Sequence, residues 1–163
     1  MHVSIAMCTY NGARFLREQL ESIASQTCLP DELVVCDDGS TDATLGILAS
    51  YAKVSNFPVR VHCNTIRLGA TRNFEQAISL AQGEVIVLSD QDDIWRHDKL
   101  QILTHNFSKH LDAGFIFSDA IVINEGGRIV LESLWKQFSF DKKKVRFFPG
   151  GPWIRYKYYS RRM

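Results

Sequence analysis

Two kinds of hydrophobic pattern follow one another along most of the chain. Short runs of Val, Ile and Leu, apolar on both faces, are typical of buried parallel strands, and they predict strands at 3–8, 32–38, 59–62 and 84–89. Segments in which apolar residues recur at helical spacing predict helices at 13–26, around 45–52, at 70–81 and around 100–107. Gly83 is expected to end the third helix, because glycine commonly follows a last helical turn. Since each strand precedes a helix, the pattern favours a Rossmann-like α/β fold, with a mostly parallel sheet, right-handed crossovers and helices on both faces.

The pattern changes after the fourth strand and helix. An apolar segment at 113–123, bent near Ser118, predicts a fifth strand, and a hairpin turn then leads into a short strand at 129–131. Beyond it no repeating element can be placed, and basic and aromatic residues become frequent. We therefore predict one domain at 1–131, followed by an irregular basic and aromatic tail at 132–163.

Acidic residues end two of the predicted strands: Asp37 and Asp38 the second, and Asp90, Asp92 and Asp93 the fourth. The carboxyl ends of parallel strands meet at one edge of a sheet, which is where open α/β proteins bind ligands. A single acidic side chain there could simply cap a helix, but capping does not account for three carboxylates within four positions. Crowded carboxylates repel one another unless a cation neutralises them, and Mg²⁺ binds one or two carboxylates together with phosphate oxygens. The sequence therefore predicts a metal and diphosphate site at this edge.

The composition narrows the class of protein. With 163 residues, 45% of them hydrophobic and 23% charged, the chain can form one domain with a substantial core. A formal net charge of +1 gives no general attraction to nucleic acid. The four cysteines lack the paired spacing of a zinc site and are expected to be reduced thiols. No apolar run approaches the length of a membrane span, and the chain opens in a strand, so a cytoplasmic location is expected. The basic residues of the tail permit contact with the inner face of a membrane.

Four motifs in order carry a resemblance to a known family. They are Thr9-Tyr10-Asn11, Asp37-Asp38-Gly39-Ser40-Thr41-Asp42, residues 64–73 with Gly69 and Arg72, and Asp90-Gln91-Asp92-Asp93-Ile94-Trp95. Over residues 1–131 the chain resembles the amino-terminal half of a family 2 glycosyltransferase. The form of the last motif is similar to that of bacterial rhamnosyl-, glucosyl- or galactosyltransferases that build surface polysaccharides.

The resemblance implies a GT-A fold, a nucleotide-diphospho-sugar donor such as a UDP- or dTDP-sugar, a saccharide or lipid-linked acceptor, and transfer with inversion. It implies donor-binding roles for Thr9, Tyr10, Asn11, Asp37, Asp38, Arg72, Asp90 and Gln91. It also implies that Asp92 and Asp93 hold Mg²⁺ or Mn²⁺. Within this assignment Asp38 meets the base, and a carboxylate suits the imide N–H of uracil or thymine as an acceptor.

Two functions remain open for the chain. An inverting transferase needs a general base within reach of the acceptor hydroxyl, and no residue of this chain is assigned that role. The chain is therefore expected to be either a glycosyltransferase or a catalytically incomplete module, cut short, that binds nucleotide sugar and metal. A phosphoacceptor receiver domain is disfavoured, because its acidic pair should follow the first strand, where Thr9-Tyr10-Asn11 stands.

Several of the residues singled out also have simpler interpretations. Tyr10 could cover the edge of the sheet with its hydroxyl in water, and Arg72 could be an exposed helix residue. Trp95 is expected to pack in the core or at the start of a helix. The resemblance implies that Asp119 lies in the strand nearest the acceptor side, where it could be functional, but it could equally be a polar residue satisfied within a bulge.

Overall fold

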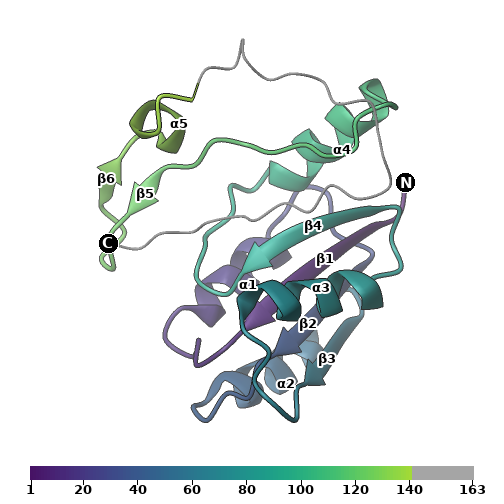
Figure 1. Ribbon diagram of the computed structural model, residues 1–163, viewed down its shortest axis with the longest axis vertical. Coiled ribbons are helices and arrows are strands. Elements are labelled where there is room, and N and C mark those ends of the chain that lie inside the picture. Colours follow the sequence, from purple (N-terminus) through teal and green to yellow (C-terminus); the bar gives the residue numbers. More distant parts are fainter. Residues whose placement is uncertain (141–163) are drawn as a thin grey trace. The chain divides into compact units, whose positions relative to one another are not determined.

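The structure is a computed structural model in which residues 1–140 are described (Figure 1). These residues form two compact units, 1–105 and 106–140. Most of the predicted tail, 141–163, lies outside the described residues.

The first unit is built on a parallel sheet. Its strands are β1 (Val3–Thr9), β2 (Glu32–Asp37), β3 (Val59–Cys63) and β4 (Val85–Asp90). They lie in the order β3-β2-β1-β4, and every neighbouring pair is parallel. The predicted strands and the parallel sheet are therefore confirmed.

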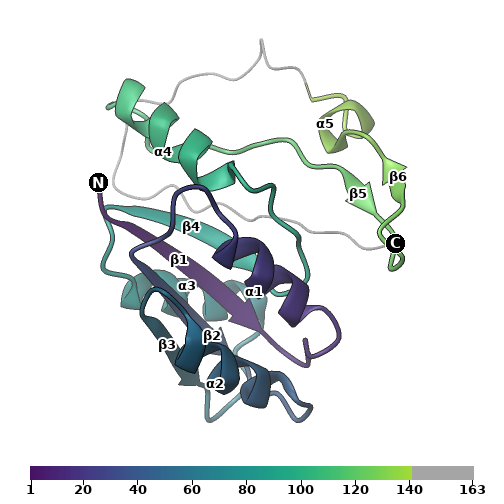
Figure 2. The same cartoon turned by 180° about the vertical axis from the view of Figure 1, so that it is seen from behind.

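Helices cover both faces of this sheet, as predicted. They are α1 (Leu16–Ala24), α2 (Thr44–Val54) and α3 (Ala70–Leu80), and α4 (Lys99–Lys109) begins in the same unit. Figure 1 shows α3 in front of the sheet, and the opposite view in Figure 2 shows α1 and α2 together on the other face.

The core lies between the helices and the two central strands. Every residue of β1 and β2 is buried, because helices cover the sheet on both sides. From β1 and β2 come Ile5 and Leu33, and from α1 come Leu16 and Leu20, all at most 1% exposed. Their burial explains why these strands are apolar on both faces.

Two predicted helix ends are wrong. The first helix begins at Leu16, not at residue 13. The third ends at Leu80, and Gly83 is not its terminating residue. A β-carbon at Gly83 would lie 2.6 Å from the main-chain nitrogen of Ser4 and 2.8 Å from the carbonyl oxygen of His2. The glycine is therefore required by the close approach of two chain segments.

In the second unit, β5 (Val122–Ile123) and β6 (Ile129–Leu131) form an antiparallel pair, followed by the short helix α5 (Leu134–Gln137). The sequence pattern missed α5, whose first turn is capped by the Ser133 hydroxyl, which accepts a hydrogen bond from the N–H of Lys136 (3.1 Å).

The predicted strand at 113–123 is wrong except for its last two residues. Its aromatic side chains gather in a local cluster: Phe117 stacks on Phe115 with ring centroids 5.9 Å apart, and meets the ring of Trp135 edge to face at 5.9 Å. The apolar pattern reflects this cluster and not a place in a sheet.

Candidate functional site

The strand order sets the place of the site. Successive strands β1, β2 and β3 extend the sheet in one direction, while β4 adds to the other side of β1. In open α/β sheets, ligands bind at such a switch point, outside the carboxyl ends of the strands. Thr9 is in register with Asp37, and Cys8 with Asp90. The two acidic segments therefore flank the end of β1, and the common edge expected from the sequence is confirmed.

Asp37 is fully buried, and both of its carboxylate oxygens accept hydrogen bonds. One accepts from the main-chain N–H groups of Gly39 (3.2 Å) and Ser40 (2.8 Å), and the other from the hydroxyls of Thr9 (2.7 Å) and Ser40 (2.6 Å). A carboxylate has about four lone-pair sites, so these donors occupy them all. Asp37 thus fixes the turn after β2 against the end of β1.

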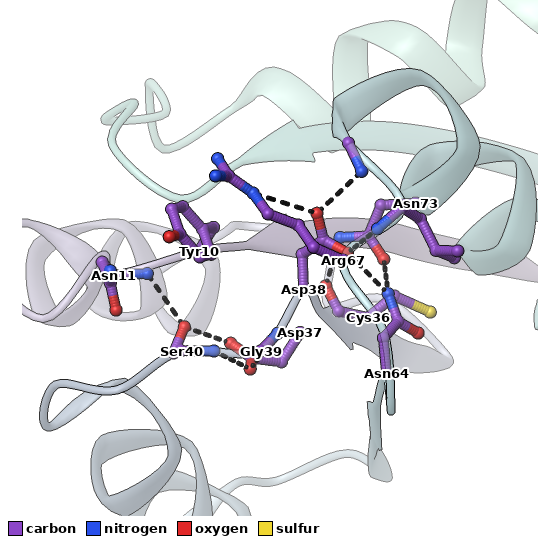
Figure 3. Close-up of polar contacts among 12 residues, drawn as sticks. Tyr10, Asn11, Cys36, Asp37, Asp38, Gly39, Ser40, Asn64, Arg67 and Asn73 are labelled. Atoms are coloured by element: carbon purple, nitrogen blue, oxygen red, sulfur yellow. Dashed lines mark hydrogen bonds and ion pairs between the residues drawn. The ribbon is translucent and has the colours of Figure 1, made fainter.

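Asp38 anchors the loop that precedes α3 (Figure 3). Its carboxylate accepts from the N–H groups of Leu68 (2.6 Å) and Gly69 (2.8 Å) and from the amide of Asn64 (3.0 Å). The guanidinium of Arg67 lies 3.9 Å away. Burial alone would raise the pKa of Asp38, but these hydrogen bonds and the charge of Arg67 outweigh it and lower the pKa below its ordinary value. Asp38 is therefore a carboxylate at neutral pH.

Arg67 also covers the ring of Tyr10, with its guanidinium carbon 3.8 Å from the ring centroid (Figure 3). An arginine over an aromatic face is held by a cation–π interaction. The ring belongs to a residue that is 37% exposed, at the edge where the strands end. Tyr10, Arg67 and Asp38 thus form one group from three loops, which we call the Tyr10 group.

The loop after β1 is tied to the loop after β2. The N–H of Asn11 donates to the hydroxyl of Ser40 (2.8 Å), and the N–H of Thr41 donates to the side-chain oxygen of Asn11 (2.8 Å). The N–H of Gly12 donates to the hydroxyl of Thr44 (2.9 Å). Asn11 takes a left-handed conformation (φ 47°) to make these bonds. Its side chain therefore orders the loops around the Tyr10 group.

Gln91 connects the loop after β1 to the turn after β4. This turn carries Asp90, Asp92 and Asp93, and we call it the acidic turn. Its side-chain oxygen accepts from the N–H of Tyr10 (2.8 Å), and its side-chain nitrogen donates to the carbonyl oxygen of Tyr10 (3.1 Å). The loop that follows β1 and the turn that follows β4 are therefore joined through one amide.

Burial and like charge act together in the acidic turn after β4. Burial raises the pKa of Asp90 to about 7, and the charges of Asp93 and Asp92 add to that shift. Within residues 1–140, no three His, Cys, Asp or Glu side chains are already arranged as a metal site. Hard oxygen donors with excess negative charge nevertheless fit Mg²⁺ or Mn²⁺, which need only one or two carboxylates when phosphate oxygens supply other ligands.

The remaining predicted residues occupy different environments. Arg72 is exposed in the first turn of α3, and the arginine beside Tyr10 is Arg67. Trp95 is 5% exposed, which confirms its packing role. In the second unit, Asp119 accepts from the hydroxyl of Ser133 (2.5 Å) and the N–H of Trp135 (3.0 Å), so its carboxyl is bonded locally.

Sequence reasoning missed several polar residues that build this edge. Asn73, 2% exposed, accepts from the amide of Asn64 (2.9 Å) and donates to the carbonyl oxygen of Cys36 (2.8 Å), so it connects α3 to β2 and the loop (Figure 3). A second set of buried polar residues, Gln19, Ser22 and Gln26, lies on α1 and the turn that follows it. The sequence did hold a signal for such residues, namely a side-chain amide among the apolar positions of a predicted helix. Asn73, in the helix that also carries Ala70 and Phe74, is an example.

All four cysteines are free thiols, as expected, with Cys8 and Cys36 buried in β1 and β2. Among residues 1–140, none of the helices has both the length and the apolar character needed to cross a bilayer.

The parallel sheet, with helices on both faces and acidic turns at its carboxyl edge, is the architecture of the GT-A glycosyltransferases. Its similarity to two solved structures agrees with this class. TarS from S. aureus, crystallised with UDP-GlcNAc, matches with a TM-score of 0.63 and 30% identity over 68% of this chain and 32% of that one. The mannosyltransferase PcManGT from Pyrobaculum calidifontis, in complex with GDP-Man and Mn²⁺, matches with a TM-score of 0.61 and 28% identity over 66% of this chain and 32% of that one.

The chain belongs to glycosyl transferase family 2, whose family model matches residues 4–160. Among curated relatives, the poly(ribitol-phosphate) beta-glucosyltransferase of Bacillus spizizenii is 34% identical over 145 residues, which is 86% of this chain and 22% of that protein. The chain spans about a third of the length of the first curated relatives that it matches.

Proposed function

We propose that the chain is the nucleotide-sugar-binding part of a glycosyltransferase of surface polysaccharide biosynthesis. It would transfer a sugar from a nucleotide-diphospho-sugar to a hydroxyl of a saccharide or lipid-linked acceptor, with inversion. The observation that carries the proposal is the meeting of two acidic segments on either side of the end of β1, with Thr9 in register with Asp37 and Cys8 with Asp90. The proposed location is the cytoplasm, at the inner face of the membrane.

The Tyr10 group is the proposed nucleoside side of the site. The ring of Tyr10 is 37% exposed and can stack on a base. The ionised carboxylate of Asp38 accepts three hydrogen bonds where about four can fit, so it can accept one more from the imide N–H of uracil or thymine. Thr9 and Asn11 shape the adjacent loops, and Asp37 supports them through its buried hydrogen bonds. We therefore favour a UDP- or dTDP-sugar, and the UDP-GlcNAc bound by TarS supports this choice.

The acidic turn is the proposed diphosphate side. Asp92 and Asp93 would hold Mg²⁺ or Mn²⁺, with Asp90 and Gln91 next to the donor and Arg72 approaching it from α3. A divalent cation bound there would neutralise the charge that develops on the leaving nucleoside diphosphate. The Mn²⁺ in the PcManGT complex supports this assignment.

The second candidate function is a module that binds donor and metal without transferring sugar. One observation favours it. Asp119, which the family resemblance places nearest the acceptor side, has its carboxyl bonded to the hydroxyl of Ser133 and to the N–H groups of Trp135 and Ala120 (2.8 Å). A general base must take up the proton of the acceptor hydroxyl. Burial alone would raise the pKa of Asp119, but these hydrogen bonds outweigh it and lower the pKa, which makes the carboxylate a weaker base.

Calorimetric titration of the chain with UDP, dTDP and GDP, each with and without Mn²⁺, tests the donor site. We expect UDP or dTDP to bind more tightly with Mn²⁺, and Asp92→Ala to abolish that gain. Asp98→Ala is the control, because Asp98 is bonded to Arg96 outside the acidic turn and should leave the gain intact. Failure of all three nucleotides to bind would contradict the proposal, and a normal Mn²⁺ effect in Asp92→Ala would contradict the metal assignment.

Turnover separates the two candidates. The chain is incubated with Mn²⁺, UDP- and dTDP-sugars and a panel of saccharide acceptors, and released nucleoside diphosphate is measured. Acceptor-dependent release supports the transferase. Donor binding without release on any acceptor supports the binding module.

A further inference from the structure

One face of α1 is polar and buried at the same time. Gln19, Ser22 and Gln26 recur at spacings of three and four residues, so they lie on one side of the helix and the turn that follows it. They are 0%, 7% and 6% exposed. Buried polar side chains are stable only when their hydrogen bonds are made, so the partners of this polar stripe define its role.

The partners of the polar stripe lie in the segment just after the acidic turn. The hydroxyl of Ser22 accepts from the N–H of Trp95 (3.0 Å). The amide of Gln26 donates to the carbonyl oxygen of Arg96 (2.8 Å) and accepts from the N–H of Leu100 (3.0 Å). These bonds hold the main chain from Trp95 to the start of α4 against α1 and the turn that follows it.

Gln19 reaches closest to the predicted metal ligands. The amide suits the carbonyl oxygen of Asp93 and the indole of Trp95 in one orientation. In it the nitrogen donates to the carbonyl oxygen of Asp93, and the oxygen accepts from the indole N–H of Trp95 (3.2 Å) and the hydroxyl of Ser89 (2.6 Å). Ser89 precedes the acidic turn and Trp95 follows it. One buried amide therefore makes hydrogen bonds to a residue on each side of the turn and to the main chain of Asp93.

We propose that Gln19 is a positioning residue for the acidic turn, and that Ser22 assists it. By holding Ser89, the main chain of Asp93 and the indole of Trp95, the amide sets where the carboxylates of Asp92 and Asp93 lie. This inference rests on the proposed function, in which those carboxylates bind the metal. Residues that orient metal ligands through hydrogen bonds have large effects on metal affinity although they do not touch the metal.

The physical reason lies in the repulsion within the turn. The like charges of the crowded carboxylates push the turn apart, while bonds to a rigid helix hold its main chain in place. A turn held in this way is preorganised, so the binding of a cation does not have to supply the free energy of ordering it.

The test compares the parent chain with Gln19→Met and Ser22→Ala. Gln19→Met keeps a side chain of similar length and removes its hydrogen bonds, whereas Ser22→Ala removes one hydroxyl from a helix where alanine is well tolerated. Ser4→Ala is the matched control: Ser4 is equally buried, and its hydroxyl bonds Glu32 (2.6 Å) and the N–H of Gly83 (2.7 Å), away from the acidic turn. Three quantities are measured: Mn²⁺ affinity in the presence of UDP, uridine affinity without metal, and amide hydrogen exchange of residues 93–96.

In Gln19→Met we expect Mn²⁺ affinity to fall by about tenfold or more, the usual effect of losing a residue that orients metal ligands. Ser22→Ala should show a smaller loss in the same direction. Uridine affinity should stay at the parent value in both variants, which a general loss of structure would not allow. Amide exchange of residues 93–96 should become faster in both variants, and Ser4→Ala should change neither Mn²⁺ affinity nor this exchange.

Parent-like Mn²⁺ affinity in Gln19→Met would overturn the inference, and so would an equal loss in Ser4→Ala. If the parent itself binds no Mn²⁺ with UDP, the proposed function fails, and amide exchange still decides the positioning role. Faster exchange of residues 93–96 in Gln19→Met would then support it, and unchanged exchange would overturn it.

Discussion

A β-carbon at Gly12 would overlap the side-chain amide of Gln91, whose Cδ atom lies 2.5 Å from the position that the β-carbon would take. That amide is the group that makes two hydrogen bonds to the main chain of Tyr10. In Gly12→Ala, Gln91 must therefore move and give up both bonds. We expect a loss of about 1–2 kcal/mol in the free energy of unfolding, measured by urea denaturation.

The double variant tests the cause of this loss. In a Gln91→Ala background the clash is absent, so adding Gly12→Ala should cost much less than in the parent. Equal costs in the two backgrounds would show that Gln91 is not the reason for glycine at this position.

Asp37→Asn should be strongly destabilising. The four donors from Thr9, Gly39 and Ser40 all face the carboxylate, and an amide would place N–H groups against some of them. Each buried donor left unpaired costs about 1–3 kcal/mol, so we expect a loss of at least that size in denaturant unfolding. Asp98→Asn, at a partly exposed carboxyl, should leave the midpoint unchanged, and a stable Asp37→Asn would refute the role assigned to this residue.

Asp38→Asn should loosen the loop before α3. Asparagine keeps one acceptor, but its amide nitrogen cannot accept from the N–H of Leu68 or Gly69. We expect faster amide exchange at these two positions. Asp31→Asn is a matched control, because its carboxyl accepts from the N–H of Val3 (2.7 Å) at the start of β1 and its loss should not affect the loop.

The parallel sheet could be predicted from the sequence, because a single physical rule applies to its strands. A strand that is apolar on both faces must be covered on both sides, so 3–8 and 84–89 identified a parallel sheet and its edge. The segment at 113–123 is also rich in apolar residues, but there Phe117 packs on Phe115 and on Trp135 of α5. Periodicity records which residues are apolar, and does not say whether they are buried or against what they pack.

The candidate site was predictable to the extent that charge marks it. Asp38 and Asp90 stand out because carboxylates rarely follow buried strands without a role. Arg67 and Gln19 carry no comparable mark, since an arginine in a loop and a glutamine in a helix are ordinary on a protein surface. Their roles follow from contacts with Tyr10 and Asp93, which are distant in sequence and become visible only once the strands are ordered.

Tyr10→Ala should weaken nucleotide binding, and Tyr10→Phe should preserve it. The proposed contact is stacking on the ring, which phenylalanine keeps and alanine removes. Stacking of a base on an aromatic side chain is worth about 1–3 kcal/mol, so UDP affinity should fall by roughly 5- to 150-fold in Tyr10→Ala. Calorimetry measures the difference. If Tyr10→Phe lost as much as Tyr10→Ala, the hydroxyl and not the ring would carry the contact.

Glu32 is expected to make part of the stability depend on pH. Burial alone would raise the pKa of this carboxyl, but hydrogen bonds from Ser4 and the N–H of Gln82, together with Arg60, lower it below its ordinary value. The carboxylate also pairs with Arg60 through Nη2 (2.5 Å) and Nε (3.1 Å). Since the folded pKa lies below the unfolded one, the stabilisation is complete above the unfolded value, about 4.3, and is lost as the pH falls through the folded value.

In Glu32→Gln we therefore expect lower stability at pH 7 and a shallower decline of the free energy of unfolding as the pH falls below about 5, because one group that takes up a proton on unfolding has been removed. Urea denaturation at a series of pH values from neutral to acid measures both effects. Glu21→Gln, on the exposed side of α1, should keep the parent's decline. A Glu32→Gln curve that runs parallel to the parent's curve throughout this range would mean that Glu32 titrates alike in the folded and unfolded chain, and the pairing with Arg60 would then make no pH-dependent contribution.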